Sequence, residues 1–314
     1  MPRRVLLTAL KVGVSLLLLG WLLHRIGLRT LLGQLHSAQT FWLVLGVVAF
    51  AVSNLSGSLQ WYLLLRAKGS CLGPAQVLGF YHIGLFFNNF LIGYIGGDAF
   101  RVYDVQRSSG DFNAAFATVF FDRFIGFFTM TSLALLFALV QVRKLASEAA
   151  LYTVAIILIG WAAALLILFR EDIARKLSLF IPRLLHARLR DVYYSINHFR
   201  HHPKPLIVIF AISVVVQSLR ILTHYFCARA FGVRLDPAIF FVFIPIIALI
   251  SSLPISLGGI GVREQSGVTL FGQFGVTSGQ VFAFEFLAYI ICILTTLPGG
   301  ILFAVRRGKK GAKA

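Results

Sequence analysis

Among the charged side chains that fall inside or beside long apolar stretches, seven have a chemistry that needs an explanation. They are Asp98, Arg101, Asp122, Arg123, Arg263, Glu264 and Glu285. A charge at membrane depth is costly unless it is paired or used, so each of these residues is a candidate for function. We assign four of them as coupling or ion-pair residues: Asp98, Asp122, Arg123 and Glu285.

Two interpretations of these four residues stay open. In the first, they form ion pairs that join the two halves of the chain, Arg123 with Glu285 or Asp122 with Arg263, because buried charges generally need partners. In the second, one of the acids is a site of proton coupling. Asn88 and Asn89 nearby could line a polar path or simply form hydrogen bonds between helices.

Glycine-rich breaks accompany the charges in two segments, NNFLIGYIGGDAFR at 88–101 and SSLPISLGGIGVREQ at 251–265. Proline lacks an amide hydrogen and glycine allows unusual φ angles, so both segments predict broken helices. Broken backbone at membrane depth must be buried in protein or line a wet cavity. Freed amides and nearby arginines suit an anionic headgroup, although glycines can also serve only for close helix packing. The predicted substrate-binding residues are Gly96, Gly97, Arg101, Pro254, Gly258, Gly259, Arg263 and Glu264.

The composition is that of an integral membrane protein. Hydrophobic residues make up 58% of the 314 residues and charged residues only 13%, with a mean hydropathy of +0.86. Soluble domains are about one quarter charged. Six apolar runs are long enough to cross a hydrocarbon core of about 30 Å. They lie at 5–23, 41–65, 124–142, 151–169, 205–227 and 280–305.

The net charge of +18 is concentrated at 170–204 and in the C-terminal tail. The positive-inside rule places both segments and both termini in the cytoplasm, across a cytoplasmic (inner) membrane. Nineteen of the 29 Lys and Arg residues then lie inside and six outside. We expect anionic lipid headgroups as partners of this charge and no nucleic acid, because no recognition motif accompanies it.

The two halves of the chain resemble each other. Tyr62–Gly69 matches Tyr225–Gly232 at a shift of 163 residues, and the GG-x-x-x-R motifs match at a shift of 162. At that same shift Arg123 falls opposite Glu285. We therefore predict an all-α membrane protein of six full spans and two re-entrant or broken-helix hairpins, 76–100 and 238–276, arranged as an inverted-topology repeat.

This repeat divides the single membrane domain into five parts. A leading span and loop occupies 1–40, the first repeat 41–142, a connecting span with a basic cytoplasmic segment 143–203, the second repeat 204–305 and a basic tail 306–314. The three cysteines show no metal-ligand spacing, and no phosphate-binding loop is present. We therefore predict no metal site and no cofactor.

Four segments resemble a known family: WYLLLRAKG at 61–69, GGDAFRVYDV at 96–105, FDRFIG at 121–126 and PISLGGIGVRE at 254–264. Over nearly the whole chain the sequence resembles the lysylphosphatidylglycerol synthase transmembrane family, also called flippase-like or UPF0104. The resemblance implies movement of aminoacylated phospholipid, by a membrane region that the best-known members join to a soluble aminoacyl transferase. Because the sequence ends at Ala314, directly after the last expected span, we do not carry the synthase activity over.

The leading hypothesis is a lipid transporter that moves an anionic or headgroup-modified, lipid-linked molecule between leaflets. One alternative is an integral-membrane transferase acting on a lipid-phosphate-linked sugar or an aminoacyl lipid, with Asp98 or Glu264 as its acid. Another is an accessory subunit for a separately encoded lipid-modifying enzyme. No nucleotide motif or metal-binding acid pair supports the transferase, so we favour the transporter and assign no catalytic residue.

Overall fold

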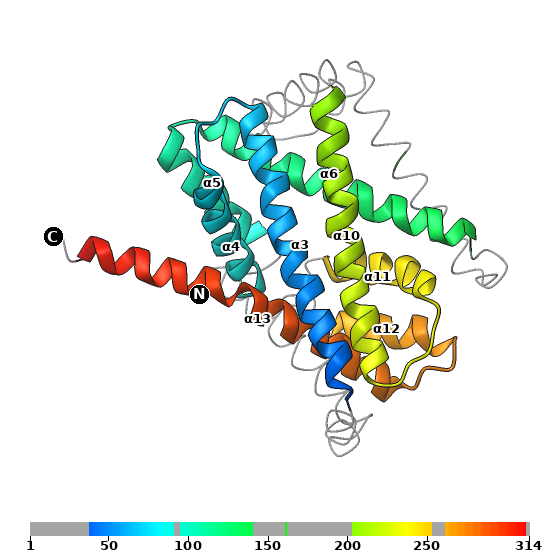
Figure 1. Cartoon of the computed structure of the whole chain (residues 1–314). Helices are drawn as coiled ribbons and strands as arrows, with labels where there is room; N and C mark the ends of the chain where they lie inside the picture. The colour runs from blue at the N-terminus through cyan, green and yellow to red at the C-terminus, as the bar shows by residue number, and fades with distance from the viewer. Residues whose placement is uncertain (1–37, 91–94, 141–160, 162–202, 253–260, 312–314) are drawn as a thin grey trace, which may run out of the picture.

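All regular secondary structure is helical in the part of the chain that the computed structural model describes, residues 38–90, 95–140, 161, 203–252 and 261–311. The all-α class predicted from the sequence is confirmed for these residues. Figure 1 labels eight helices there. They are α3 (Thr40–Ala67), α4 (Pro74–Phe90), α5 (Ile95–Ser109), α6 (Phe112–Val140), α10 (Pro203–Ala230), α11 (Pro237–Ser252), α12 (Val262–Gly272) and α13 (Ser278–Gly311).

Four of these helices are long and apolar enough to cross a membrane. They contain the segments Thr40–Ala67, Phe112–Val140, Pro205–Ala230 and Ser278–Arg306. These match the runs predicted at 41–65, 124–142, 205–227 and 280–305, whereas the runs at 5–23 and 151–169 lie outside the described residues. Six full spans therefore stay a prediction.

The helix α6 begins earlier than predicted, at Phe112 rather than at residue 124. Asp111 caps its first turn, because one carboxylate oxygen accepts a hydrogen bond from the amide of Ala114 at 2.9 Å. The helix then continues through Asp122 and Arg123. Hydropathy alone excluded this charged pair from the span, but partners on a neighbouring helix allow both charges to sit within it.

Each predicted hairpin contains two short helices that pack against each other. In the first hairpin α4 packs on α5, and in the second α11 packs on α12. The turns between them, 91–94 and 253–260, lie outside the described residues. Pro254, Gly258 and Gly259 fall in the second of these turns, so the structure does not describe them.

The first glycine pair lies inside a helix, not in the break where the sequence placed it. Gly96 and Gly97 belong to the first turn of α5. A Cβ atom added at Gly97 would collide with the carbonyl oxygen of Gly84 and with the side chain of Asn88, both on α4. Close packing of α5 on α4 therefore explains this glycine.

The helices α3 and α10 lie side by side and antiparallel at the centre of the bundle (Figure 1). The amide of Gln39, just before α3, donates a hydrogen bond to the carbonyl of Ala230 at the end of α10, at 3.0 Å. Further along, the Thr223 hydroxyl lies 3.5 Å from the carbonyl oxygen of Gly46. Gly46 also permits α13 to pack closely here, because a Cβ at Gly46 would lie 3.3 Å from the Ile291 side chain.

The two halves also pack crosswise. The last helix of the second half, α13, packs on α4 of the first half, and α6 of the first half packs on α11 of the second. At the first crossing a Cβ on Gly299 would collide with the backbone of His82. The outer surface of the described bundle carries exposed apolar side chains, including Phe41, Val140 and Ile207, as lipid contact requires.

Candidate functional site

The charged residues of the first half form one compact cluster where α5 packs against α6. Arg101 is its centre, with only 1% of its side chain exposed. Its Nη2 donates to a carboxylate oxygen of Asp122 at 2.8 Å, and its Nη1 lies 3.3 Å from a carboxylate oxygen of Asp98. The guanidinium carbon also lies 4.2 Å from the ring centroid of Trp61 and 4.8 Å from that of Tyr81. The charge is thus held by two carboxylates and two aromatic faces.

Arg123 completes the cluster from α6. Its Nε and Nη2 donate to the two oxygens of Asp98 at 2.7 and 2.9 Å, which is the bidentate geometry that favours arginine over lysine. Two arginines and two aspartates therefore balance one another. Asp98 bridges both arginines, because α5 places it one helical turn from Arg101 on the same face.

The ion pairs predicted to join the two halves are wrong. Arg123 is paired with Asp98, not with Glu285, and Asp122 is paired with Arg101, not with Arg263. The physical reason is proximity. The helices α5 and α6 are consecutive and pack against each other, so their opposite charges lie close together and pair within the first half.

Two uncharged residues also support the cluster, Gln60, which the sequence analysis did not note, and Asn88, which it did. Gln60 on α3 donates to Asp122 at 2.8 Å, and both side chains are buried. The side chain of Asn88 accepts a hydrogen bond from the amide of Gly97 at 2.9 Å, which ties the end of α4 to the start of α5. A glutamine directly before Trp61 in an apolar span was the available signal for the first of these.

In the second half, Glu264 stabilises the start of α12. Its carboxylate accepts a hydrogen bond from the amide of Gly261 at 2.6 Å, and its side chain is 1% exposed. Gly261 has a φ of 82°, a left-handed conformation that favours glycine. The neighbouring Arg263 lies with its guanidinium carbon 5.0 Å from the ring centroid of Tyr289 on α13. The two adjacent residues therefore have different surroundings.

Glu285 is fully buried on α13 and contacts His224 on α10. The imidazole Nδ1 lies 3.2 and 3.1 Å from the two carboxylate oxygens. This contact also stays within one half of the chain. His224 was not singled out from the sequence, although it lies inside an apolar helix, where a histidine is rare.

Polar side chains link the two halves where α4 crosses α13. The side-chain amide of Asn89 donates a hydrogen bond to the Thr296 hydroxyl at 2.7 Å. The Tyr289 hydroxyl lies 3.4 Å from the backbone oxygen of Asn89. Asn54 of α3 reaches Thr295 of α13 at 3.5 Å. For Asn89 the structure therefore favours a hydrogen bond between helices over a polar lining.

The predicted site residues thus divide into three groups. Arg101, Asp98, Asp122 and Arg123 are brought together in the first half. Arg263, Glu264 and Glu285 lie on the neighbouring helices α12 and α13, which pack against each other. Gly96 and Gly97 lie on α5 with the first group, and the third group, Pro254, Gly258 and Gly259, lies outside the described residues.

Comparison with known proteins agrees with the four motifs found in the sequence. The family model of the lysylphosphatidylglycerol synthase TM region matches residues 8–300. A UPF0104 membrane protein of Methanothermobacter thermautotrophicus is 25% identical over 339 residues, covering 98% of this chain and 94% of the relative. The chain is a multi-pass integral membrane protein, and it belongs to the lysylphosphatidylglycerol synthase transmembrane family.

Proposed function

We propose that this protein transports a lipid, moving an anionic or headgroup-modified molecule between the two leaflets of the cytoplasmic membrane. The observation that carries the proposal is the concentration of buried charge on the two broken hairpins and the helices that follow them. Arg101 and Glu264 are each 1% exposed, within a bundle whose outer surface is apolar. Charge kept at such depth is expensive and marks the paths of polar groups through membranes.

The inverted repeat is part of this proposal. Exchanging α3 with α10, α4 with α11, α5 with α12 and α6 with α13 maps each hairpin and each crosswise contact onto its counterpart. The antiparallel pairing of α3 with α10 agrees with a two-fold axis in the membrane plane. Two similar halves of opposite orientation can exchange conformations, which is how alternating access arises in transporters of this architecture.

Arg263 is our candidate for the residue that binds the headgroup. It follows the second break directly, and its contact with Tyr289 holds the guanidinium plane against an aromatic ring. A planar guanidinium can bind two phosphate oxygens at once, whereas the lysine ammonium acts as a point charge. Glu264, which fixes the amide of Gly261, would hold the backbone at the start of the half-helix while the headgroup passes.

The test uses purified full-length protein in vesicles with fluorescent phosphatidylglycerol, and it measures how fast label becomes accessible to an impermeant quencher. We expect movement without any new covalent product. R263A should slow it roughly tenfold or more, since a hydrogen bond to a charged group contributes about 1.5–3 kcal/mol. R263K should slow it less. R234A, which removes an exposed arginine between α10 and α11, is the matched control.

Three results would contradict the proposal. If the wild-type protein moves no lipid, the proposed transport function is wrong. If a new covalent lipid product forms, the transferase is favoured. If R263A and R263K lose transport only in proportion to lost folded protein, then Arg263 has a structural role and does not bind the headgroup.

A further inference from the structure

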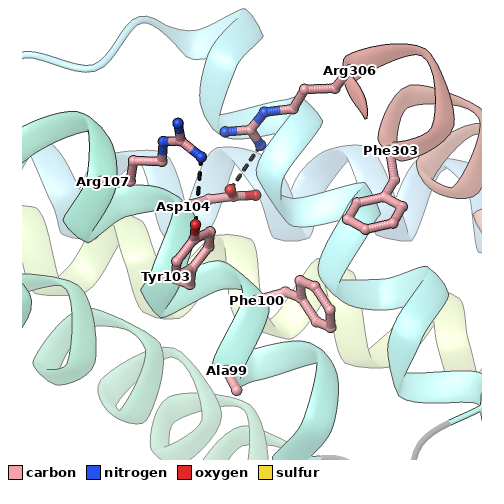
Figure 2. A pocket seen from close by; sticks show the side chains of 7 residues that line it. All are labelled: Ala99, Phe100, Tyr103, Asp104, Arg107, Phe303 and Arg306. Carbon is pink, nitrogen blue, oxygen red and sulfur yellow. Dashed lines mark hydrogen bonds and ion pairs between the residues drawn. The ribbon is translucent and has the colours of Figure 1, made fainter. Parts of the chain in front are cut away.

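A pocket of about 440 Å³ lies between α5 and α13 (Figure 2), and its lining includes neither Arg263 nor any residue of the charged cluster. Its apolar part is formed by Phe100 and Phe303. Its polar part is formed by Tyr103, Asp104, Arg107 and Arg306, so two guanidinium groups accompany one carboxylate. The volume is within the range of about 300–1,000 Å³ that is typical of small-molecule sites, and the mixture of apolar and basic residues suits an anionic amphiphile.

The apolar part of the pocket is preformed by packed aromatic rings. Phe87 of α4 stacks on Phe100 with centroids 4.0 Å apart, and it meets Phe303 edge-on at 4.9 Å. Phe100 and Phe303 are themselves 5.8 Å apart in an edge-on arrangement. Three helices therefore fix these rings in place, and a ligand that binds here does not have to order them.

The basic part of the pocket is also held in position. The Nη1 of Arg306 donates to a carboxylate oxygen of Asp104 at 2.7 Å, and its guanidinium lies 5.2 Å from the ring centroid of Phe80. Arg107 donates to the Tyr103 hydroxyl at 3.4 Å, a long contact that Figure 2 shows as a dashed line. A guanidinium carries five N–H donors, so both arginines keep donors for a further anion.

The charges along α5 explain why Arg107 is available for a ligand. Every third residue of this helix is charged and the sign alternates, through Asp98, Arg101, Asp104 and Arg107. Three residues of an α-helix turn about 300°, so each charge in this row is rotated about 60° from the one before it. The row therefore winds around α5, from α6, which pairs with the first two, to α13, whose Arg306 pairs with Asp104. Among the described residues no ion pair is formed by Arg107, which is exposed at the end of the row.

We propose that this pocket binds an anionic phospholipid, with the phosphate on Arg107 and Arg306 and the start of an acyl chain on the aromatic rings. A lipid fits better than a soluble anion because the neighbouring surface of α13 is apolar. Ile301 is 64% exposed and Val305 56%. The apolar segment Ser278–Arg306 of α13 is long enough to cross a hydrocarbon core of about 30 Å, which places Arg306, at its end, at the level of the headgroups. This inference goes beyond the proposed function, since a lipid held here need not be one that is moved.

The test uses photoactivatable phosphatidylglycerol on the purified full-length protein in detergent, with crosslinked peptides identified by mass spectrometry. We expect saturable crosslinks within 99–107 and 300–306, and much weaker ones with phosphatidylcholine. R107A should raise the Kd for these crosslinks about tenfold, the size of one charge-assisted hydrogen bond. R66A removes an exposed arginine at the end of α3 and should leave the Kd unchanged.

Arg306 needs a separate comparison, because R306A leaves Asp104, whose side chain is 5% exposed, without this partner and can unfold the protein. R306K keeps the charge and should weaken binding less than R107A. Equal Kd values for wild type and R107A would overturn the proposal. Competition by glycerol phosphate at the lipid's own concentration would also overturn it, because the site would then recognise a soluble anion. Neither outcome depends on transport, which this experiment does not measure.

Discussion

Replacing Asp122 tests whether the cluster between α5 and α6 is stabilised by balanced charge. The carboxylate accepts hydrogen bonds from Arg101 and Gln60, both at 2.8 Å, and all three side chains are at least nine-tenths buried. D122A removes both hydrogen bonds and the negative charge. D122N removes the charge but keeps an amide that can still accept from Arg101.

The magnitude follows from what remains around Arg101. Breaking a buried ion pair costs about 3–5 kcal/mol, because the remaining charge is left without its partner in a poor solvent. Asp98 still lies 3.3 Å from Arg101, and Trp61 still covers it, so part of the interaction survives. We therefore expect D122N to lower the free energy of unfolding by about 2–3 kcal/mol and D122A by about 3–5 kcal/mol.

A compensating change separates charge balance from loss of shape. The cluster holds two arginines and two aspartates, so D122N leaves it with one excess positive charge and R101Q with one excess negative charge. The double variant is neutral again. We expect it to be more stable than the sum of the two single changes predicts, by about 1–3 kcal/mol, a normal coupling for residues in contact.

The assay is reversible unfolding by sodium dodecyl sulfate in mixed micelles, followed by circular dichroism for wild type and the four variants D122N, D122A, R101Q and the double. D111N is the control, because Asp111 is exposed and asparagine still caps α6, so it should change stability by less than about 0.5 kcal/mol. A D122A protein within 1 kcal/mol of D111N would refute the reasoning, and so would strictly additive effects in the double variant.

Two further predictions follow. G84A should destabilise the protein by about 1–3 kcal/mol, because the new Cβ would lie 2.6 Å from the Cγ of Arg101. G79A on the same helix meets no atom within 4 Å and should gain up to about 1 kcal/mol, so equal stability of the two variants would contradict the packing. In an otherwise cysteine-free chain, an impermeant thiol reagent added to intact cells should label Q273C and not S109C. The reverse pattern would overturn the predicted topology.

Much of the fold could be predicted because apolar length is a direct physical requirement of the bilayer. The four runs that fall in the described residues became four long helices, and the two glycine-rich segments became paired short helices. The errors are at the polar ends. The start of α6 was predicted after Asp122 and Arg123, because a hydropathy average does not include the ion-pair partners that α5 supplies to these two residues.

The candidate site was less predictable, because a sequence shows which residues are charged but not which ones meet. Arg101 and Asp98 were identified correctly as unusual, yet the pairing followed helix packing and not the symmetry of the repeat. Trp61 and Tyr81, which cover Arg101, look like ordinary span aromatics in the sequence. His224 belongs to the same class, since only the packing of α10 on α13 shows that it meets Glu285.

The placement of the ion pairs has a consequence for the proposed exchange of conformations between the halves. The ion pairs of Arg101 with Asp122 and of Arg123 with Asp98 stay within the first half, and the contact of His224 with Glu285 stays within the second. Had they joined the halves, every transition would separate buried charges, at a cost of several kcal/mol for each pair.

The contacts between the halves are instead of kinds that can be exchanged cheaply. They include close approaches permitted by Gly46 and Gly299, neutral hydrogen bonds such as that from Asn89 to Thr296, and a long contact of 3.5 Å from Arg220 to the Tyr81 hydroxyl. The described ion pair that does join them, Arg306 with Asp104, lies at the end of the bundle, where the arginine side chain is 36% exposed and water can replace the partner. An ion pair that stays within one half, such as Arg101 with Asp122, is not separated when the two halves shift against each other.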